Sequence, residues 1–288
     1  MTVQNPHITP EARENLSQYY GLDKPLYYQF IVFLSQLFEG NLGSAYAIRG
    51  GTAVTTLIAD YLWPTLELQL SALILSLLIA IPIGILSAKK QYSKLDVTVT
   101  TTSLLGTCIP IFYMGIISII IFSYFLGWFP YGGAHSILPR NYPFGSYLLD
   151  KLWHMVLPTA VLTFASLATI MLLVRSSMLE VLRQDYILAA RASGLSERTV
   201  IYKHALRNTL IPIVTYVGLY FGFMLAGAPV TETVFNWPGL GRLFVEALTK
   251  LDFPVIMGIT VFITLMTLVA NLVTDITYAY IDPRIRLE

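Results

Sequence analysis

The sequence is poor in charge, in cysteine and in clustered reactive side chains, and each shortage excludes a class of protein. Only 12% of its 288 residues are charged, about half of the roughly 25% that is typical of soluble globular domains. The single cysteine, Cys108, rules out an internal disulfide, and its apolar surroundings predict a small buried side chain. The net charge of +1 favours neither nucleic acid nor an acidic partner.

Groups that could carry out catalysis are equally sparse. The four histidines have no metal-ligand spacing to one another or to the cysteine; they are His7, His135, His154 and His204. No Gly-Lys dipeptide occurs, so the phosphate-binding loop of an ATPase is absent. We therefore expect no catalytic residue, no metal and no cofactor in this chain. If ATP drives its activity, another protein binds the nucleotide.

Apolar side chains, in contrast, make up 55% of the chain. A helix needs about 20 apolar residues to cross a bilayer core, and five stretches qualify: 65–87, 99–126, 154–174, 209–228 and 254–280. Prolines or glycines interrupt four of them, which spanning helices tolerate because neighbouring helices satisfy the freed backbone groups. The sequence thus predicts an all-α membrane protein with five spans.

The distribution of lysine and arginine predicts how these spans are oriented. Eleven of the eighteen lie in the connections 88–98, 175–208 and 281–288, and basic connections face the cytoplasm. The tryptophans at positions 63, 128, 153 and 237 lie toward the opposite side, as an interfacial aromatic belt would place them. The C-terminus is then cytoplasmic, and residues 1–62 form an extracytoplasmic segment.

Two further features of the chain bear on this topology. The polar start, MTVQNPHITPEARENL, lacks the basic and apolar regions of a signal peptide, so we expect an additional spanning helix upstream of it. Glu67 and Asp275 are the only acids inside the spans, and both lie near span ends. We expect them to pair or to reach the interface, which argues against a proton- or ion-coupled carrier.

The longest basic connection, 175–208, predicts two short helices. Asp185 is placed to N-cap a helix over Tyr186–Ser193, and Gly194 to end that helix in the left-handed conformation. Ser196 is placed to cap a second helix, Glu197–Leu206. A plain spacer between two spans is usually short and irregular, so this connection has a further role.

The first of these helices is rich in alanine. We expect it to expose Ala189, Ala190 and Ala192, whose small side chains let the backbone of another protein approach closely. Arg183 and Arg191 are placed to meet acidic groups at the rim. We interpret the connection as a docking surface for a second protein.

These residues resemble a known family. The run DYILAARASGLS, followed by HALRN, is similar to the cytoplasmic loop of binding-protein-dependent ABC importer permeases, whose general form is Glu-Ala-Ala, three residues, then Gly. Ala189, Ala190 and Gly194 match that form, whereas Leu188 stands in place of glutamate and Arg207 in place of a proline. These departures resemble the B-type permease of the peptide/nickel subfamily.

Other segments carry the same resemblance. Residues 21–46, 231–258 and 282–286 look like parts of that subfamily, and residues 237–241 (WPGLG) predict a turn before an amphipathic helix, Arg242–Thr249. The resemblance covers nearly the whole chain and implies a type I ABC importer transmembrane domain over residues 63–288, with the family's first span missing and an extracytoplasmic cap. It implies an inner-membrane location.

The resemblance also implies function, partners and site residues. The chain would form half of a pathway for dipeptides or oligopeptides, beside a C-type permease, with two cytoplasmic ATPases and an extracytoplasmic binding protein. Nickel or oligosaccharides are the alternative cargo, and a stand-alone carrier or channel the alternative class. The implied ATPase-docking residues are Asp185, Tyr186, Ala189, Ala190, Arg191, Ala192, Gly194 and His204.

Overall fold

The computed structural model describes residues 23–136 and 143–281, and most of these residues are helical. An isolated bridge between Ser44 and Ala53 is the only β-pairing among them. The helices, in chain order, are α2 (Leu26–Phe38), α3 (Val54–Lys89), α4 (Lys94–Cys108), α5 (Ile111–Ser118), the π-helix η2 (Ile119–Phe125), α6 (Phe144–Leu182), α7 (Asp185–Ala192), α8 (Glu197–Thr199), the π-helix η3 (Val200–Ala205), α9 (Leu206–Met224), α10 (Pro229–Val234), α11 (Leu240–Lys250) and α12 (Phe253–Ile281).

Three of these helices are long and apolar enough to cross a membrane: α3, α6 and the Phe253–Thr274 part of α12. The pair formed by α4 and α5–η2 passes the same test as a fourth, broken span. Pro64, Pro82 and Pro158 all lie inside continuous helices, as expected when packing against neighbouring helices compensates for the missing backbone donors. The predicted all-helical membrane fold is confirmed.

The second predicted span, 99–126, is wrong as a continuous helix. The chain bends by 96° between α4 and α5. Ile109 is extended there, with φ −82° and ψ 122°, and Pro110 is the N-cap of the next helix, α5. A proline disfavours helical backbone in the residue before it and supplies no N–H. Cys108, predicted to be buried, ends α4 beside this bend and is exposed.

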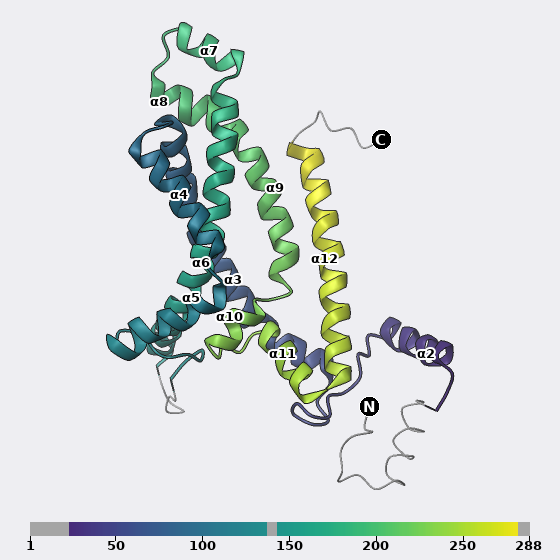
Figure 1. Cartoon of the computed structure of the whole chain (residues 1–288). Helices are drawn as coiled ribbons and strands as arrows, with labels where there is room; N and C mark the ends of the chain where they lie inside the picture. The colour runs from purple at the N-terminus through teal and green to yellow at the C-terminus, as the bar shows by residue number, and fades with distance from the viewer. Residues whose placement is uncertain (1–22, 137–142, 282–288) are drawn as a thin grey trace.

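The fourth predicted span corresponds to α9, which ends at Met224, before the chain turns at Gly227 (φ +78°). Among the described residues, α9 is not one of the helices that meet the length and hydropathy test for a span. Polar side chains at its start, Arg207 and Asn208, lower its apolar content. It packs lengthwise against α12 and against α6, so that it still belongs to the helical bundle (Figure 1).

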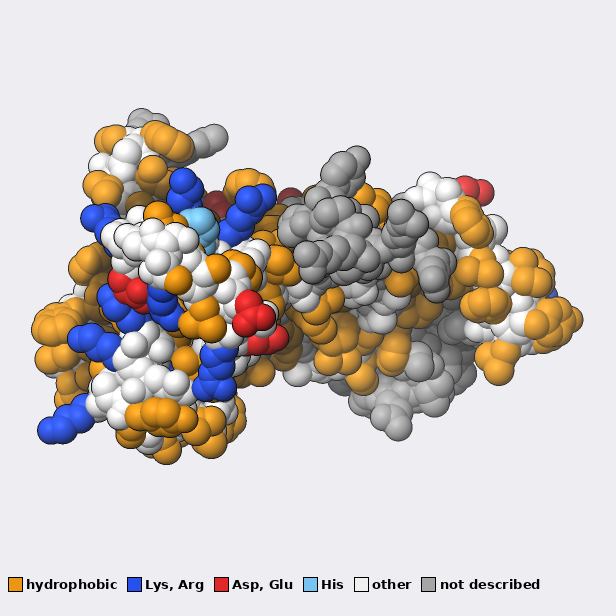
Figure 2. Space-filling view, turned by 90° about the horizontal axis from the view of Figure 1, so that it is seen from above, with side chains coloured by type: hydrophobic (Ala, Val, Ile, Leu, Met, Phe, Trp, Pro, Cys, Tyr) orange, Lys and Arg blue, Asp and Glu red, His pale blue; other side chains and the backbone are white. Residues whose placement is uncertain are grey.

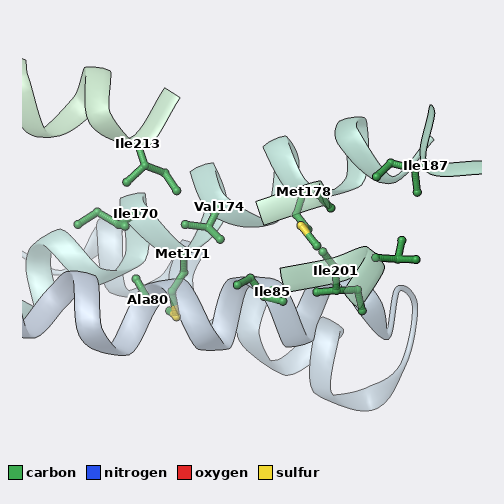
Figure 3. Close-up of a cluster of buried hydrophobic side chains, with 12 residues drawn as sticks. Ala80, Ile85, Ile170, Met171, Val174, Met178, Ile187, Ile201 and Ile213 are labelled. Atoms are coloured by element: carbon green, nitrogen blue, oxygen red, sulfur yellow. The ribbon is translucent and has the colours of Figure 1, made fainter. Parts of the chain in front are cut away.

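The central contact of the bundle is between α3 and α6. A Cβ atom at Gly84 of α3 would lie 2.7 Å from Val174 of α6, so only glycine lets the two helices approach this closely. Around this crossing lies a core of buried residues, which Figure 3 shows as sticks: Ala80, Ile85, Ala88, Ile170, Met171, Val174, Met178, Ile187, Val200, Ile201, Ala205 and Ile213. This core extends from α3 and α6 to the helices that follow α6.

At the opposite end, a cap consists of residues 225–252, which include α10 and α11, together with the loop 41–53 (Figure 1). The helix predicted over Arg242–Thr249 is present as α11, but it begins two residues earlier, so that Leu240 and Gly241 of the predicted turn are helical. Trp237 is not part of an aromatic belt, because it is fully buried and its Nε1 donates to the Pro64 carbonyl at 2.9 Å. The other three tryptophans are more than half exposed.

The cap is organised around the buried carboxyl of Glu232. Its oxygens accept hydrogen bonds from Thr65 Oγ1 (3.0 Å), the Ala228 N–H (3.1 Å) and the Arg242 N–H (2.9 Å). A Cβ atom at Gly239 would overlap this carboxyl group, which explains the glycine in the turn. Burial raises the pKa of Glu232, and its hydrogen bonds oppose that shift. One side chain thus joins α3, α10 and the start of α11.

Candidate docking site

The candidate site is the hairpin of residues 183–205, which projects beyond the bundle at the end opposite the cap (Figure 1). Helix α6 continues past the bundle to Leu182, and the chain then enters α7 after two residues. The turn after α7 leads into α8, η3 and α9. The hairpin therefore connects the end of one long helix directly to the start of another.

The turn of the hairpin has the predicted conformation. Gly194 adopts φ +79°, and its N–H donates to the Arg191 carbonyl at 3.0 Å. No atom lies near the position of a Cβ there, so backbone conformation rather than space requires glycine. The start of α7 differs by one residue from the prediction: Asp185 is the first helical residue, and Gln184 stands at the N-cap without a side-chain bond. Asp185 still places a negative charge at the positive end of the helix.

The second arm of the hairpin starts as predicted but does not end there. Ser196 Oγ accepts the Thr199 N–H at 3.3 Å, which confirms the cap. The helix predicted to end at Leu206 instead passes through η3 into α9 without a break. Neither glycine nor proline occurs between Glu197 and Ile211 to stop it. Because the arm and α9 are continuous, a displacement of the hairpin must move α9.

The inner side of α7 is held firmly. Ile187 is fully buried and belongs to the core cluster that includes Met178, Val200 and Ile201 (Figure 3). Asn208 Nδ2, at the start of α9, donates to the hydroxyl of Tyr186 at 2.6 Å. Close packing and this hydrogen bond make α7 a rigid part of the bundle end rather than a mobile loop.

The outer side of the hairpin is apolar and uncovered. Leu188 is 53% exposed, and Leu195 and Tyr186 are each 42% exposed. Ala189 and Ala192 are exposed as predicted, but Ala190 is half-buried, because it packs against the same core as Ile187. Exposed apolar side chains next to alanines, on a rigid support, are typical of a protein-docking surface.

Charged side chains surround this apolar surface. Figure 2 looks onto this end of the molecule and shows lysine and arginine side chains around the hairpin. Arg191, predicted to meet a partner's acid, pairs within the hairpin: its Nε and its second terminal nitrogen lie 3.2 and 2.9 Å from the carboxylate oxygens of Glu197. This hydrogen-bonded pair holds the pKa of Glu197 below its usual range.

The predicted site residues fall into two groups. Seven of them gather on α7 and its turn, which leaves His204 apart: it lies in η3 on the second arm and is half-buried. The seven are Asp185, Tyr186, Ala189, Ala190, Arg191, Ala192 and Gly194.

A buried ion pair beneath the hairpin was missed by the sequence reasoning. Arg175 of α6 binds both carboxylate oxygens of Asp96 at the start of α4, at 2.6 and 2.8 Å. Ser87 of α3 and the Tyr92 N–H also donate to Asp96, which is 2% exposed. We call these groups the Asp96 clamp. The clamp ties α3 and α4 to the helix that carries the hairpin.

A local signal for part of the clamp was present in the sequence. Ser93 and Asp96 have the spacing of a helix-capping pair, and Ser93 Oγ does accept the Asp96 N–H at 3.3 Å. The partner Arg175 lies 79 residues away. No local pattern connects two groups so distant in sequence.

Two acids were predicted inside the spans, Glu67 and Asp275. Glu67 pairs with Lys151 at 2.7 Å, which confirms that this acid is an interhelical partner. The side chain of Asp275 lies outside the described part of the chain. In that described part, no three His, Cys, Asp or Glu side chains gather in a way that could hold a metal ion.

Comparisons with known proteins agree on one family. The family model described as binding-protein-dependent transport system inner membrane component matches residues 80–287. The oligopeptide transport system permease protein AppB of Bacillus subtilis is 44% identical over 283 residues, covering 98% of this chain and 88% of the relative. The di/tripeptide permease DppB of Pseudomonas aeruginosa is 40% identical over 296 residues, covering 98% and 86%.

A solved structure supports the fold. An inward-facing crystal structure of the MetNI methionine ABC transporter has a chain that superposes with a TM-score of 0.63. The alignment covers 78% of this chain and 96% of that chain, at 17% sequence identity. At that identity the likeness concerns the arrangement of helices alone.

Proposed function

Because the chain belongs to the family of binding-protein-dependent transport system inner membrane components, we propose that it is a permease subunit that forms half of the pathway of an ATP-driven peptide importer. The relatives that support a peptide as cargo are permeases of oligopeptide and di/tripeptide transport systems. Nickel and oligosaccharides remain the alternative cargo of the subfamily, and no relative compared above is named for them.

The hairpin is the proposed site at which a cytoplasmic ATPase docks. The observation that carries this proposal is the combination of an uncovered apolar surface, at Leu188, Ala189 and Ala192, with a buried anchor at Ile187 on the same short helix. A helix held from inside and uncovered outside can transmit force from a partner to the bundle. The two connections at the hairpin end, 88–98 and 175–208, hold nine of the eighteen lysines and arginines, so we place this end in the cytoplasm, together with the C-terminus.

The geometry of the hairpin gives a route from ATP hydrolysis to transport. A force on α7 acts on α6 through the two-residue connection and on α9 through the continuous second arm. The Asp96 clamp extends the same displacement to α3 and α4. ATP-driven closure of two ATPase subunits would thus tilt several spans together, as alternating access requires.

The other partners follow from the same proposal. One permease subunit supplies only half of the pathway, so a similar C-type permease would complete it. An extracytoplasmic binding protein would deliver the peptide to the cap. In this proposal ATP hydrolysis resides in the separate ATPase chains, in keeping with the missing phosphate-binding loop in this sequence.

Site-directed crosslinking tests the docking proposal. In a Cys108→Ser background, we expect a crosslink from Ala189→Cys to the ATPase subunit in assembled complexes. Thr233→Cys, which is equally exposed but lies in the cap, is the matched control and should give none. Failure of Ala189→Cys to crosslink in complexes that hydrolyse ATP would refute the docking assignment while leaving family membership intact.

Reconstitution tests the wider proposal. We expect peptide uptake into vesicles only when the chain is combined with its partner permease, the binding protein and the ATPases, and only with ATP. Uptake by the isolated chain, or uptake that continues without ATP, would identify a self-sufficient carrier or channel instead.

A further inference from the structure

Helix α2 is the part of the described chain that has least contact with the rest. None of its 13 residues is buried, although most are apolar. The exposed members include six large apolar or aromatic side chains, with exposures between 47% and 88%: Leu26, Tyr27, Tyr28, Phe30, Ile31 and Phe38. So much apolar surface on one short helix requires a covering partner.

The position of α2 along the membrane normal is fixed by the chain that follows it. The Gly43 carbonyl accepts the Val54 N–H at 3.0 Å, and a Cβ at Gly43 would lie 3.6 Å from Pro254 at the start of α12. The carboxylate of Asp252 accepts the N–H groups of Ala47 and Ile48 at 2.8 and 3.0 Å. Asp252 directly precedes α12. The end of α2 is therefore only a few residues from the cap end of a spanning helix.

Length and direction exclude α2 itself as a span. Thirteen residues of α-helix are about 20 Å long, whereas a bilayer core is about 30 Å thick. Figure 1 shows α2 beside the cap end of α12 and lying across the direction of that helix, and Figure 2 shows it standing out sideways from the bundle. A short helix with this position and direction fits the plane of a membrane surface better than a span.

The two sides of α2 differ in polarity. At 100° per residue, Leu26, Phe30 and Leu37 lie on one side of the helix. Leu34 and then Tyr27 extend this apolar side around the helix. The polar residues Gln29, Ser35 and Gln36 fall on the opposite side, which they share with Tyr28 and Val32. A short helix with one broad apolar side and a narrower side that carries all of its polar residues suits the boundary between lipid headgroups and acyl chains.

We propose that α2 is an interfacial anchor whose apolar side inserts into the lipid bilayer at the cap end of the spans. Binding rests on apolar burial rather than on charge. The only base beside the helix, Lys24, lies 3.4 Å from Asp23, and Glu39 follows the helix. Insertion should therefore be the same in purely zwitterionic membranes and in membranes that contain anionic lipid.

Fluorescence quenching tests the anchor on the full-length chain. An environment-sensitive dye is attached to Phe30→Cys or to Gln36→Cys in a Cys108→Ser background, and the protein is reconstituted into phosphatidylcholine vesicles. Both residues are exposed, so neither variant should disturb folding, and protease resistance of the bundle checks this. Bromine atoms placed near the headgroup or deep in the acyl chain report contact with lipid.

We expect a blue shift and a loss of fluorescence for Phe30→Cys, stronger with shallow than with deep bromines, and neither effect for Gln36→Cys. Adding phosphatidylglycerol should change nothing. A blue shift without quenching by brominated lipid would mean that a protein surface covers α2 and would overturn the proposal. A water-like signal at both positions would overturn it as well. Neither result would bear on ATPase docking, since α2 and the hairpin are at opposite ends of the molecule (Figure 1).

Discussion

The cap and the hairpin, at the two ends of one bundle, differ in which side chains they bury. In the cap, Glu232 and Trp237 are completely buried, and their polar atoms bond to backbone and side-chain groups of the same chain. In the hairpin, leucine, tyrosine and alanine side chains are uncovered, and the Arg191–Glu197 pair is largely exposed. The cap is a closed structure, whereas the hairpin leaves an apolar surface uncovered, and this is the surface to which we propose that an ATPase docks.

This difference indicates how much each end contributes to the free energy of unfolding. Buried polar groups are costly to disturb, because a lost partner leaves a desolvated group unpaired. Exposed ion pairs contribute little, because water screens them. Substitutions in the cap and in the clamp should therefore reduce stability, whereas substitutions on the hairpin surface should reduce coupling to a partner and leave stability unchanged.

The largest expected effect is on the Asp96 clamp. Asp96→Ala leaves the Arg175 guanidinium without its partner in a mostly buried position, and we expect a loss of about 3–5 kcal/mol in the free energy of unfolding. Denaturant titration in detergent measures it. Lys94→Ala, an exposed neighbour on the same turn of α4, is the control and should change little. Equal stability of the two variants would show that the clamp does not hold the bundle.

The next effect concerns Glu232. In Glu232→Gln, an NH₂ group replaces one carboxylate oxygen and faces groups that donated hydrogen bonds to that oxygen. We expect a loss of about 1–3 kcal/mol in the free energy of unfolding. The half-buried Glu246 of α11 forms an ion pair with the neighbouring Lys250, so Glu246→Gln should stay within about 0.5 kcal/mol. Matching losses in both variants would contradict the closed character of the cap.

The stability of the parent protein should also depend on pH through Glu232. Burial raises the pKa of Glu232, so protonation favours the folded state. Its stabilising contribution is present below the ordinary glutamate pKa and is lost as the pH rises through the raised folded-state value. Unfolding measured across that window should show this loss in the parent protein and not in Glu232→Gln.

Gly194→Val should impair coupling to the ATPase and also cost some stability. A β-branched side chain at φ +79° strains the turn by about 1–3 kcal/mol, which should misplace α7 and uncouple ATP hydrolysis from peptide uptake. Gly194→Asn is the matched control, since asparagine tolerates the left-handed conformation. The measurement is the number of peptides taken up per ATP hydrolysed. Normal coupling in the valine variant would contradict a role of the turn in docking.

The smallest expected effect is on the exposed pair. Arg191→Ala should cost less than about 1 kcal/mol of stability. Because Arg191 lowers the pKa of Glu197, the pair stabilises the folded state above the ordinary glutamate pKa, and this is lost as the pH falls through the lowered value. Thermal unfolding of the parent protein and of Arg191→Ala, measured at pH values near and below the ordinary glutamate pKa, checks this loss. A loss as large as that for Asp96→Ala would show that the hairpin is not an open surface.

Local features of the chain were predictable to different degrees. The hairpin turn followed from Gly194 and the cap at Ser196, because each acts on backbone within a few residues. The end of the second arm did not, since a helix without a stop signal continues as far as packing allows. The break at Pro110 was mistaken for a tolerated proline, because sequence alone does not say whether neighbouring helices satisfy the backbone.

The burial of single residues was the least predictable feature. Trp237 resembled a belt residue, and Ala190 resembled its exposed neighbours, but contacts with distant segments bury the first and half-bury the second. Cys108 lies in an apolar stretch, yet the bend beside it leaves it exposed. In each case, elements far apart in the sequence decide which side chains they cover.

The sequence by itself determined the membrane environment, the approximate helices and the hairpin turn, because hydropathy, proline, glycine and capping residues act over a few residues of chain. Only the tertiary structure decided that Glu232 joins three helices, that Asp96 meets Arg175, and that α7 is anchored inside and open outside. These contacts join residues dozens of positions apart, and their energy comes from removing paired polar groups and packed side chains from water, which no local pattern records.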